Sequence, residues 1–349
     1  MLAAWIQKPM KIVWREAPTP EPAEGEVLVR VEACGVCGTD VDYGEDLAGE
    51  PIPLGHEAVG IVEQIGAGVA VDLLDKHVIV QNYIHCNACE NCLNGKWDQC
   101  LNMISYMDAN QPYYQAAMAD YMLLPQRLVC EYDPTGLTPE AATLAEPLAV
   151  ALDMVAEADV PLRGDVAVFG PGPIGLMAVK LCALRGARRI FLTVPSSGSP
   201  RHLKRAQLGE QLGATDVIFL DRTDAVQRIL QICPNGLDRV LVTAPPKTVP
   251  DAIRMIKYGG IISFIGVTFA GDEVVPIDLQ LLHFRKAQLR SSYAIPDIRW
   301  PLALDLLRSK VVDPELLITH VRPLREVEHA MCIAAAGSEP VCKVVVDCR

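Results

Sequence analysis

The stretch Gly170-Pro171-Gly172-Pro173-Ile174-Gly175 decides the fold of this chain. It follows an apolar run at residues 166–169 and opens a helical pattern over residues 174–184, which Gly186 can cap. In this context a G-x-G-x-x-G turn lets a pyrophosphate approach the bare backbone, and the N-terminus of the helix holds its charge. The stretch therefore predicts a dinucleotide-binding turn. An ordinary strand-to-helix turn is the alternative.

The chain around this turn alternates between two patterns. Apolar runs recur between helical stretches at residues 166–169, 190–194, 217–220, 240–243 and 261–265. This alternation predicts βαβ units and a doubly wound parallel sheet of the Rossmann type, in the α/β class. We assign residues 151–287 to it.

The two ends of the chain look different from the middle. Short apolar runs punctuated by Gly and Pro, such as residues 27–31 and 58–62, predict a β-rich domain over residues 1–150. Residues 288–349 contain helical patterns at 300–308 and 326–336 and a last strand at 343–346. We read them as returning to the first domain, because five or six strands complete a doubly wound unit.

Composition narrows the function classes. The chain has 349 residues and a net charge of -12, with a pI near 5.1. This argues against nucleic acid or an anionic membrane surface as a partner. No apolar stretch is long enough to span a bilayer, and the start lacks the features of a signal peptide. We expect a cytoplasmic protein that acts on a small molecule.

A loop at residues 85–102 contains four cysteines in a tight spacing: Cys86, Cys89, Cys92 and Cys100. Four thiolates close a tetrahedral structural zinc site. An iron–sulfur cluster also uses four cysteines, and four incidental cysteines are the remaining alternative. We favour zinc because the chain also contains a dinucleotide turn and a second candidate metal site.

That second site combines Cys37 with His56 and Glu57. Thiolate, imidazole and carboxylate together suit a catalytic zinc that keeps one position open. Each residue also has a structural explanation: a buried thiol, a core histidine and its partner. Cys34 and Cys37 could instead form a C-x2-C redox pair.

The chain resembles the zinc-dependent medium-chain alcohol dehydrogenases over essentially its whole length. The resemblance rests on four motifs that occur in the same order as in that family: residues 35–40, residues 55–57, the four-cysteine lobe and the glycine turn. The Glu146-Pro147 pair resembles the sorbitol (polyol) and threonine dehydrogenase branch. The resemblance implies a GroES-like catalytic domain with a Rossmann domain inserted in it, and a dimer or tetramer. It also implies that Glu146 lies at the zinc, as a direct ligand or bonded to the zinc-bound water.

The resemblance further implies roles around the zinc. Thr39 and Glu146 position the alcohol, and Tyr43 matches a tyrosine that lines the substrate site in sorbitol dehydrogenases. The branch usually has a histidine for proton transfer at the position of Asp42. We expect Asp42, with an ordinary carboxyl pKa of about 3.9, to accept the proton as an ionised group.

The resemblance and the turn together give the expected cofactor-binding residues: Gly170, Gly172, Pro173, Ile174, Gly175, Ser196, Ser197, Arg201 and Gly266. NAD enzymes place an acid about twenty residues past the glycines, on the ribose, but no Asp or Glu lies between Asp165 and Glu210. Arg201, Lys204 and Arg205 could meet a 2′-phosphate. NADP is therefore favoured over NAD.

We expect Zn²⁺ to act as a Lewis acid on a secondary alcohol whose hydride passes to NAD(P). Polyols, cyclitols, sugars and 3-hydroxy amino acids are all candidate substrates. One alternative is a threonine-type or other non-sugar alcohol dehydrogenase. The other is a binding module that keeps the fold without the activity.

Overall fold

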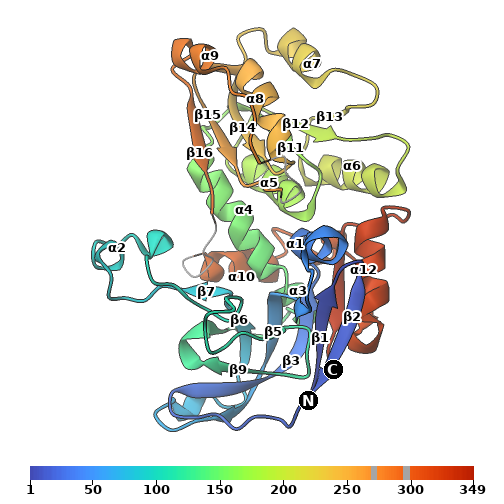
Figure 1. Ribbon diagram of the computed structural model, residues 1–349. Coiled ribbons are helices and arrows are strands. Elements are labelled where there is room, and N and C mark those ends of the chain that lie inside the picture. The colour runs from blue at the N-terminus through green and yellow to red at the C-terminus, as the bar shows by residue number, and fades with distance from the viewer. Residues whose placement is uncertain (269–272, 294–298) are drawn as a thin grey trace. The chain divides into compact units, whose positions relative to one another are not determined.

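The computed structural model describes residues 1–268, 273–293 and 299–349. The contacts divide the chain into two compact units (Figure 1). The first unit contains Met1–Glu146, Ile295–Ala336 and Lys343–Arg349, and the second contains Pro147–Ala294 and Gly337–Cys342. The second unit is thus inserted in the first, as the sequence predicted.

The second unit is built on a six-stranded parallel sheet with the order β13-β12-β11-β14-β15-β16. Its strands are β11 (Asp165–Phe169), β12 (Arg189–Val194), β13 (Asp216–Phe219), β14 (Leu237–Val242), β15 (Ile256–Phe264) and β16 (Gln288–Ser291). The order reverses beside β11, which is where open α/β sheets bind their ligands.

Helices follow the strands of this sheet in turn. They are α5 (Pro173–Leu184), α6 (Pro200–Leu212), α7 (Ala225–Ile232), α8 (Val249–Met255) and α9 (Leu279–Phe284). Apolar side chains of α7, α8 and α9 share one core with the sheet, while α5 and α6 contact β11, β12 and β13. These elements confirm the predicted doubly wound fold.

The predicted end of this unit at residue 287 is too early, because β16 (Gln288–Ser291) pairs in parallel with β15. The strand contains Gln288, Arg290 and Ser291, and none of its residues is fully buried. It lies at the edge of the sheet. An edge strand of this kind has no apolar run by which a sequence pattern could identify it.

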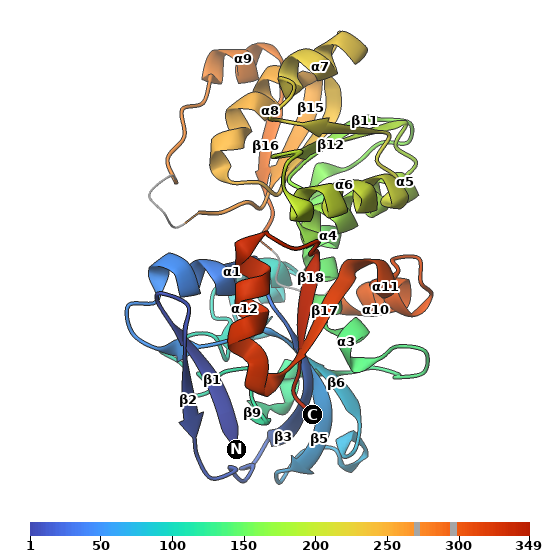
Figure 2. The ribbon, with the colours of Figure 1, turned by 90° about the vertical axis from the view of Figure 1, so that its right-hand side faces the viewer.

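The first unit is β-rich. Its largest sheet contains β3 (Glu26–Gly35), β5 (Glu57–Ile65), β6 (His77–Val80), β9 (Tyr121–Pro125), β10 (Val129–Glu131), β17 (Ile318–Pro323) and β18 (Lys343–Asp347). The smaller sheets contain β1 (Leu2–Gln7), β2 (Lys11–Glu16) and β4 (Ile52–Pro53), and β7 (Tyr83–Ile84) and β8 (Ile104–Ser105). Figure 2 shows β17 and β18, from the end of the chain, in this unit.

Short helices connect these strands. They are α1 (Gly38–Asp42), the π-helix η1 (Tyr43–Leu47), α2 (Glu90–Leu93), α3 (Pro139–Ala142), α10 (Trp300–Arg308), α11 (Pro314–Leu317) and α12 (Val327–Ala336). Single 3-10 turns lie at Val71–Leu73, Trp97–Gln99, Gln126–Leu128 and Leu324–Glu326, and in the second unit at Pro246–Thr248. The helix α4 (Ala145–Ala158) starts in the first unit and continues in the second. None of the described helices is long and apolar enough to cross a membrane.

Candidate active site

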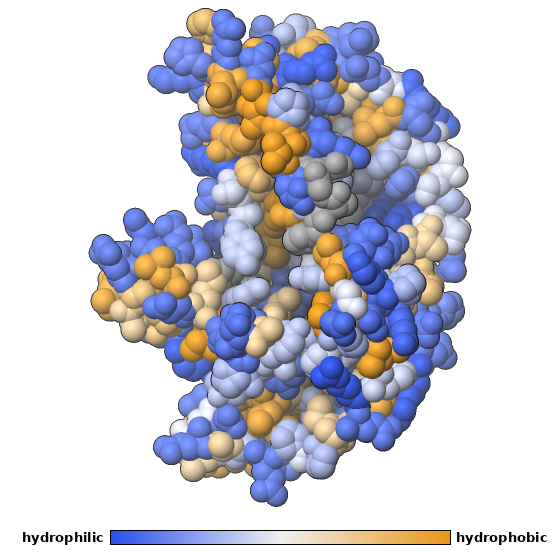
Figure 3. Space-filling view, in the orientation of Figure 1, coloured by the Kyte–Doolittle hydropathy of each residue, from blue (hydrophilic) through white to orange (hydrophobic). Residues whose placement is uncertain are grey.

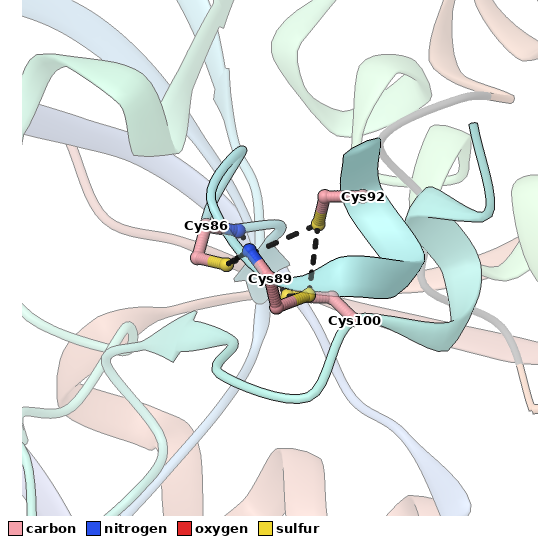
Figure 4. A group of neighbouring side chains, drawn as sticks. All are labelled: Cys86, Cys89, Cys92 and Cys100. Carbon is pink, nitrogen blue, oxygen red and sulfur yellow. Dashed lines mark hydrogen bonds between the residues drawn. The ribbon is translucent and has the colours of Figure 1, made fainter. Parts of the chain in front are cut away.

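The four cysteines of the lobe at residues 85–102 point toward one another (Figure 4). Cys92 lies on α2, and the other three lie on the loops before and after it. All four sulfur atoms lie within 4.8 Å of one another. The Sγ atom of Cys92 is 3.9 Å from that of Cys86 and 3.4 Å from that of Cys89.

These distances fit a single ion. Zinc–sulfur bonds of 2.3 Å in a tetrahedron place the sulfur atoms about 3.8 Å apart, whereas a cluster of several iron atoms holds its thiolates further apart. Backbone N–H groups of Ala88 and Cys89 donate to Cys86 Sγ, and that of Leu101 donates to Cys89 Sγ. The bonds from Ala88 and Cys89 lower the pKa of Cys86, and the bond from Leu101 is the main cause that lowers the pKa of Cys89 to about 6, which favours thiolates. The lobe therefore fits a structural zinc.

The second group of possible ligands contains Cys37, His56 and Glu57, whose ligand atoms also lie within 4.8 Å of one another. Cys37 is the N-cap residue of α1, and Glu57 is the first residue of β5. The Thr39 hydroxyl oxygen lies 3.8 Å from Cys37 Sγ. The fold thus gathers residues from two sequence motifs into one site.

Asp40 holds this site together, although sequence reasoning gave it no role. Its carboxylate accepts hydrogen bonds from the backbone N–H groups of Cys37 at 2.9 Å and Gly55 at 3.3 Å. Its Oδ1 atom lies 3.5 Å from His56 Nδ1. A carboxylate in this position fixes the orientation of a ligating imidazole. The Cys-x2-Asp spacing at the start of a helix was the signal that could have identified it.

Lys343 is the second residue that sequence reasoning missed. Its ammonium group donates to Glu57 at 2.5 Å, and both side chains are almost completely buried. The pair joins β18 at the end of the chain to β5 near its start. No local pattern links residues this far apart.

Glu146 lies outside the group of atoms within 4.8 Å. It is buried and accepts a hydrogen bond of 2.8 Å from Asn82 Nδ2. Burial and the neighbouring Glu57 carboxylate raise the pKa of Glu146 to about 7. Direct ligation by Glu146 stays a prediction.

The charges around this group fit a divalent cation. Asp40, Glu57 and Glu146 are buried carboxylates, and Cys37 adds a thiol. Lys343 contributes one positive charge. Burial lowers the pKa of His56, but Cys37 and Asp40 outweigh this and raise it well above its ordinary value. A buried cluster of this kind can give up protons in exchange for a metal ion, and thiolate, imidazole and carboxylate are zinc ligands, so the residues fit a zinc ion.

Asp42 and Tyr43 follow the candidate ligand Cys37 by five and six residues in the chain. Asp42 is the last residue of α1, three residues after Thr39, and its side chain is exposed. Burial of part of the group, with Glu45 and Asp46 nearby, raises the pKa of Asp42 above its ordinary value. The expected unperturbed carboxyl pKa was therefore wrong. Tyr43 is half-buried and begins η1. The roles of both residues stay predictions.

The glycine turn has the shape that its sequence predicts. Gly170 has a φ of +101°, and a Cβ on Gly175 would lie 2.0 Å from the Gly170 carbonyl oxygen. Around Gly172, in contrast, a Cβ would meet nothing within 4 Å. Pro173 and Ile174 form the first turn of α5. The backbone is thus open where a pyrophosphate would approach and tight where helix and strand meet.

Other expected cofactor residues have structural contacts. A Cβ on Gly266 would lie 1.9 Å from the Ala244 carbonyl oxygen, so close packing explains this glycine. Arg205 donates to the carbonyl oxygens of Val341 and Cys342, and burial lowers its pKa to about 10. The expectation that Arg205 meets a phosphate is therefore wrong. The Arg201 guanidinium lies against Gly337.

Comparison with known proteins identifies the family. Residues 23–134 match the alcohol dehydrogenase GroES-like domain, and residues 173–309 match the zinc-binding dehydrogenase domain. The chain is 31% identical to a zinc-type alcohol dehydrogenase-like protein of Escherichia coli, over 97% of this chain and 95% of the relative. The chain belongs to the zinc-dependent medium-chain alcohol dehydrogenase family.

Two further relatives have names that specify a substrate. A sorbitol dehydrogenase of Bacillus subtilis is 27% identical over 99% of this chain and 97% of its own. An L-threonine 3-dehydrogenase of Pyrococcus horikoshii is 30% identical over 87% of this chain and 86% of its own. A zinc-binding dehydrogenase structure from Sinorhizobium meliloti, solved with NADP, has 29% identity, a TM-score of 0.84 and coverage of 99% of both chains.

The family and the site together establish the activity at a coarse level. The protein is a zinc-dependent alcohol dehydrogenase that uses NAD(P). The lobe at residues 85–102 fits the structural zinc, and the group around Cys37 fits the catalytic zinc.

Proposed function

We propose that this dehydrogenase oxidises a secondary hydroxyl group of a polyhydroxy compound: a polyol, cyclitol or sugar. The observation that carries the proposal is the buried hydrogen bond between Asn82 and Glu146 beside the metal-binding group. The Asn82 Oδ1 atom has no hydrogen-bond partner in the part of the chain that the structure describes. A substrate with several hydroxyls can donate to it, whereas an apolar substrate would leave it unpaired. The similarity to a sorbitol dehydrogenase supports the same substrate class.

The residues around the site have different roles in this reaction. Cys37 and His56, with Glu57 or Glu146, hold the zinc, which supplies Lewis-acid stabilisation of the substrate oxygen when it is bound. Asp40 fixes His56 in position. The Thr39 hydroxyl receives the proton of the substrate and passes it toward Asp42, which follows it by one helical turn on α1.

A turnover screen tests the substrate class. The zinc-loaded protein is assayed with sorbitol, xylitol, myo-inositol, L-threonine, ethanol and a long-chain primary alcohol, with NAD and with NADP. We expect kcat/KM for the best polyol or cyclitol to exceed that for ethanol by at least about a hundredfold. The highest kcat/KM with a simple aliphatic alcohol would refute the proposal.

A threonine-type dehydrogenase is the second candidate, supported by the threonine dehydrogenase that is 30% identical to this chain. A 3-hydroxy amino acid carries an ammonium and a carboxylate group, and both would need partners in the site. The same screen separates the candidates. A kcat/KM for L-threonine above that of every polyol would assign the protein to the threonine type.

We also propose that copies of this chain associate. Val274, Leu279 and Phe284 expose most of their surface, and Leu279 lines the same hollow of the surface as Gln288 of the edge strand β16. Figure 3 shows apolar side chains gathered in this part of the second unit. An apolar surface beside an open sheet edge is typical of an interface. Light scattering should show a dimer or tetramer, which Phe284→Glu weakens. A parent protein that stays monomeric at micromolar concentration would refute this.

A further inference from the structure

The tip of β12 contains a hydrogen-bonded cluster that the sequence did not predict, formed by Ser196, Ser197, Asp221 and Arg222. The Oδ2 atom of Asp221 accepts from Ser196 Oγ at 3.0 Å, from the Ser197 backbone N–H at 2.8 Å and from Ser197 Oγ at 3.0 Å. Arg222 Nε donates to Ser197 Oγ at 2.7 Å. Asp221 thus lies beside Ser196 and Ser197, the residues that follow the end of β12.

The sheet register explains why these residues meet. Val194, the last residue of β12, pairs with Phe219, the last residue of β13. The Leu220 N–H then donates to the Val194 carbonyl oxygen at 2.9 Å. Two residues beyond the paired ends, Ser196 and Asp221 come together. In Rossmann sheets the ribose of the adenosine half is bound at the end of the second strand, and β12 is that strand here.

We propose that Asp221 replaces the missing acid of β12, accepts hydrogen bonds from the adenosine ribose hydroxyls of NAD, and makes the enzyme prefer NAD over NADP. The proposal rests on the proposed function only in requiring that a nicotinamide dinucleotide binds to this unit. It reverses the expectation of NADP drawn from the sequence.

The donors and acceptors of the cluster favour a ribose. Both serine hydroxyls donate to Asp221, so their protons are already committed. The Oδ1 atom of Asp221 accepts no hydrogen bond from the part of the chain that the structure describes. A 2′-hydroxyl and a 3′-hydroxyl are donors and fit such an oxygen, whereas a phosphate has only acceptors at neutral pH.

The charge of the cluster also favours a ribose over a 2′-phosphate. The Ser197 backbone N–H and the two serine hydroxyls lower the pKa of Asp221, which keeps it ionised at neutral pH. A 2′-phosphate would bring about two further negative charges. Like charges at this distance repel, even at a solvated surface. Asp221 therefore disfavours NADP by charge as well as by hydrogen bonding.

Two of the three basic residues that suggested NADP, Arg205 and Arg201, contact other parts of the chain. The Arg205 guanidinium donates to the carbonyl oxygens of Val341 and Cys342, and that of Arg201 lies against Gly337. Arg222 remains in the cluster, with its guanidinium over the Phe219 ring and its Nε on Ser197. It offsets part of the charge of Asp221, and it is the residue that would hold a 2′-phosphate if the proposal were wrong.

Binding measurements test the proposal without any alcohol substrate. Isothermal titration calorimetry of the zinc-loaded full-length protein gives Kd values for NAD, NADP, AMP and 2′,5′-ADP. We expect NAD to bind at least about tenfold more tightly than NADP, and AMP more tightly than 2′,5′-ADP. Asp221→Asn should tighten NADP binding and reduce the preference about tenfold. Glu210→Gln removes one exposed negative charge from α6 and should leave the ratio unchanged.

Three results would overturn the proposal: equal or tighter binding of NADP by the parent, an unchanged ratio in Asp221→Asn, or a selective loss of NADP affinity in Arg222→Ala. Thermal unfolding of each variant verifies that the fold is intact. The substrate screen tests only the proposed substrate class, and these titrations test only the role of Asp221. A protein that prefers NAD but oxidises no polyol would disprove only the substrate class, and one that prefers NADP and oxidises polyols would disprove only the role of Asp221.

Discussion

Asp42 shows how one residue sets the pH dependence of a proton path. A group that accepts the proton of the alcohol must be ionised, and burial, Glu45 and Asp46 all raise the pKa of Asp42. The rate of oxidation should therefore fall as the pH drops through this raised pKa. Asp42→Asn should slow oxidation by up to 10²–10⁴-fold, the range for a lost acid–base group. Steady-state kinetics of the best substrate from pH 9 down to about pH 4, the range of an ordinary carboxyl group, measure this.

Two further variants make the assignment of Asp42 specific. Asp42→His should recover much of the rate and introduce a pH dependence near 6.5, the ordinary histidine pKa. Glu45→Gln keeps Asp42 but removes a charge that raises its pKa. It should shift the acid limb to lower pH without slowing the reaction at neutral pH. An Asp42→Asn variant as fast as the parent throughout this range would show that the proton leaves through water.

The four-cysteine lobe is an element whose stability depends on its metal. In the part of the chain that the structure describes, it contains only the four-residue helix α2, the turn Trp97–Gln99 and loops. Leu93 and Leu101 are exposed there. A segment with so little buried apolar surface depends on zinc for its folding energy. The lobe should therefore lose its structure when one ligand is lost.

Cys92→Ser tests the lobe. The parent should contain two zinc ions per chain, and Cys92→Ser should contain one and unfold at a lower temperature, measured by plasma mass spectrometry and calorimetry. Cys332 is exposed on α12, so Cys332→Ser is the matched control and should keep both ions. Cys37→Ser should lose the other zinc and the activity with little change in stability. Two zinc ions and an unchanged melting temperature in Cys92→Ser would contradict the structural role.

The elements divide into those that a sequence pattern predicts and those that it does not. The glycine turn and α5 follow from local rules, and so does α3, where Thr138 Oγ1 accepts from the Ala141 N–H as a helix cap. The strand β16 was missed because a polar edge strand has no apolar period. Arg205 was predicted to meet a 2′-phosphate, because no local pattern shows that its guanidinium donates to the carbonyl oxygens of Val341 and Cys342 near the end of the chain.

The candidate site also contains residues that the sequence predicted and residues that only the structure shows. The ligand types predicted that Cys37, His56 and Glu57 form one group, and their ligand atoms do lie within 4.8 Å of one another. The residues that support them were found only in the structure, because their contacts depend on strand register. Asp221 meets Ser196 through the pairing of β12 and β13, and Lys343 meets Glu57 through the main sheet of the first unit. Such pairings join residues that no local pattern connects.

At the scale of the whole molecule, the end of the chain completes a site that begins near its start. The strand β18 runs antiparallel to β3, with Val346 opposite Cys34. This brings Lys343 against Gly35, where a Cβ would lie 3.1 Å from Lys343 Cε and 1.9 Å from Glu57 Oε2. Only glycine leaves room for the buried ion pair. The fold of the first unit and its metal site therefore depend on the same contact.

Lys343→Met should destabilise the protein strongly. It leaves Glu57 as a buried charge without its partner, which costs about 3–5 kcal/mol. Urea unfolding measures this loss, and Lys343→Arg should restore part of it. Lys310 pairs with Glu315 on the surface, and such exposed pairs contribute about 0–1 kcal/mol. Lys310→Met is therefore the matched control for the loss of a lysine charge.

The pH dependence separates this ion pair from a packing effect. Burial lowers the pKa of Lys343, but Glu57 and Cys37 outweigh burial and raise it above the ordinary value. A raised lysine pKa contributes stability that is complete below about pH 10.4 and is lost only as the pH rises through the folded value. The difference between Lys343→Met and the parent should thus be constant from pH 6 to 9 and shrink in stronger alkali. A difference below about 1 kcal/mol at neutral pH would show that Glu57 has another partner, such as the zinc itself.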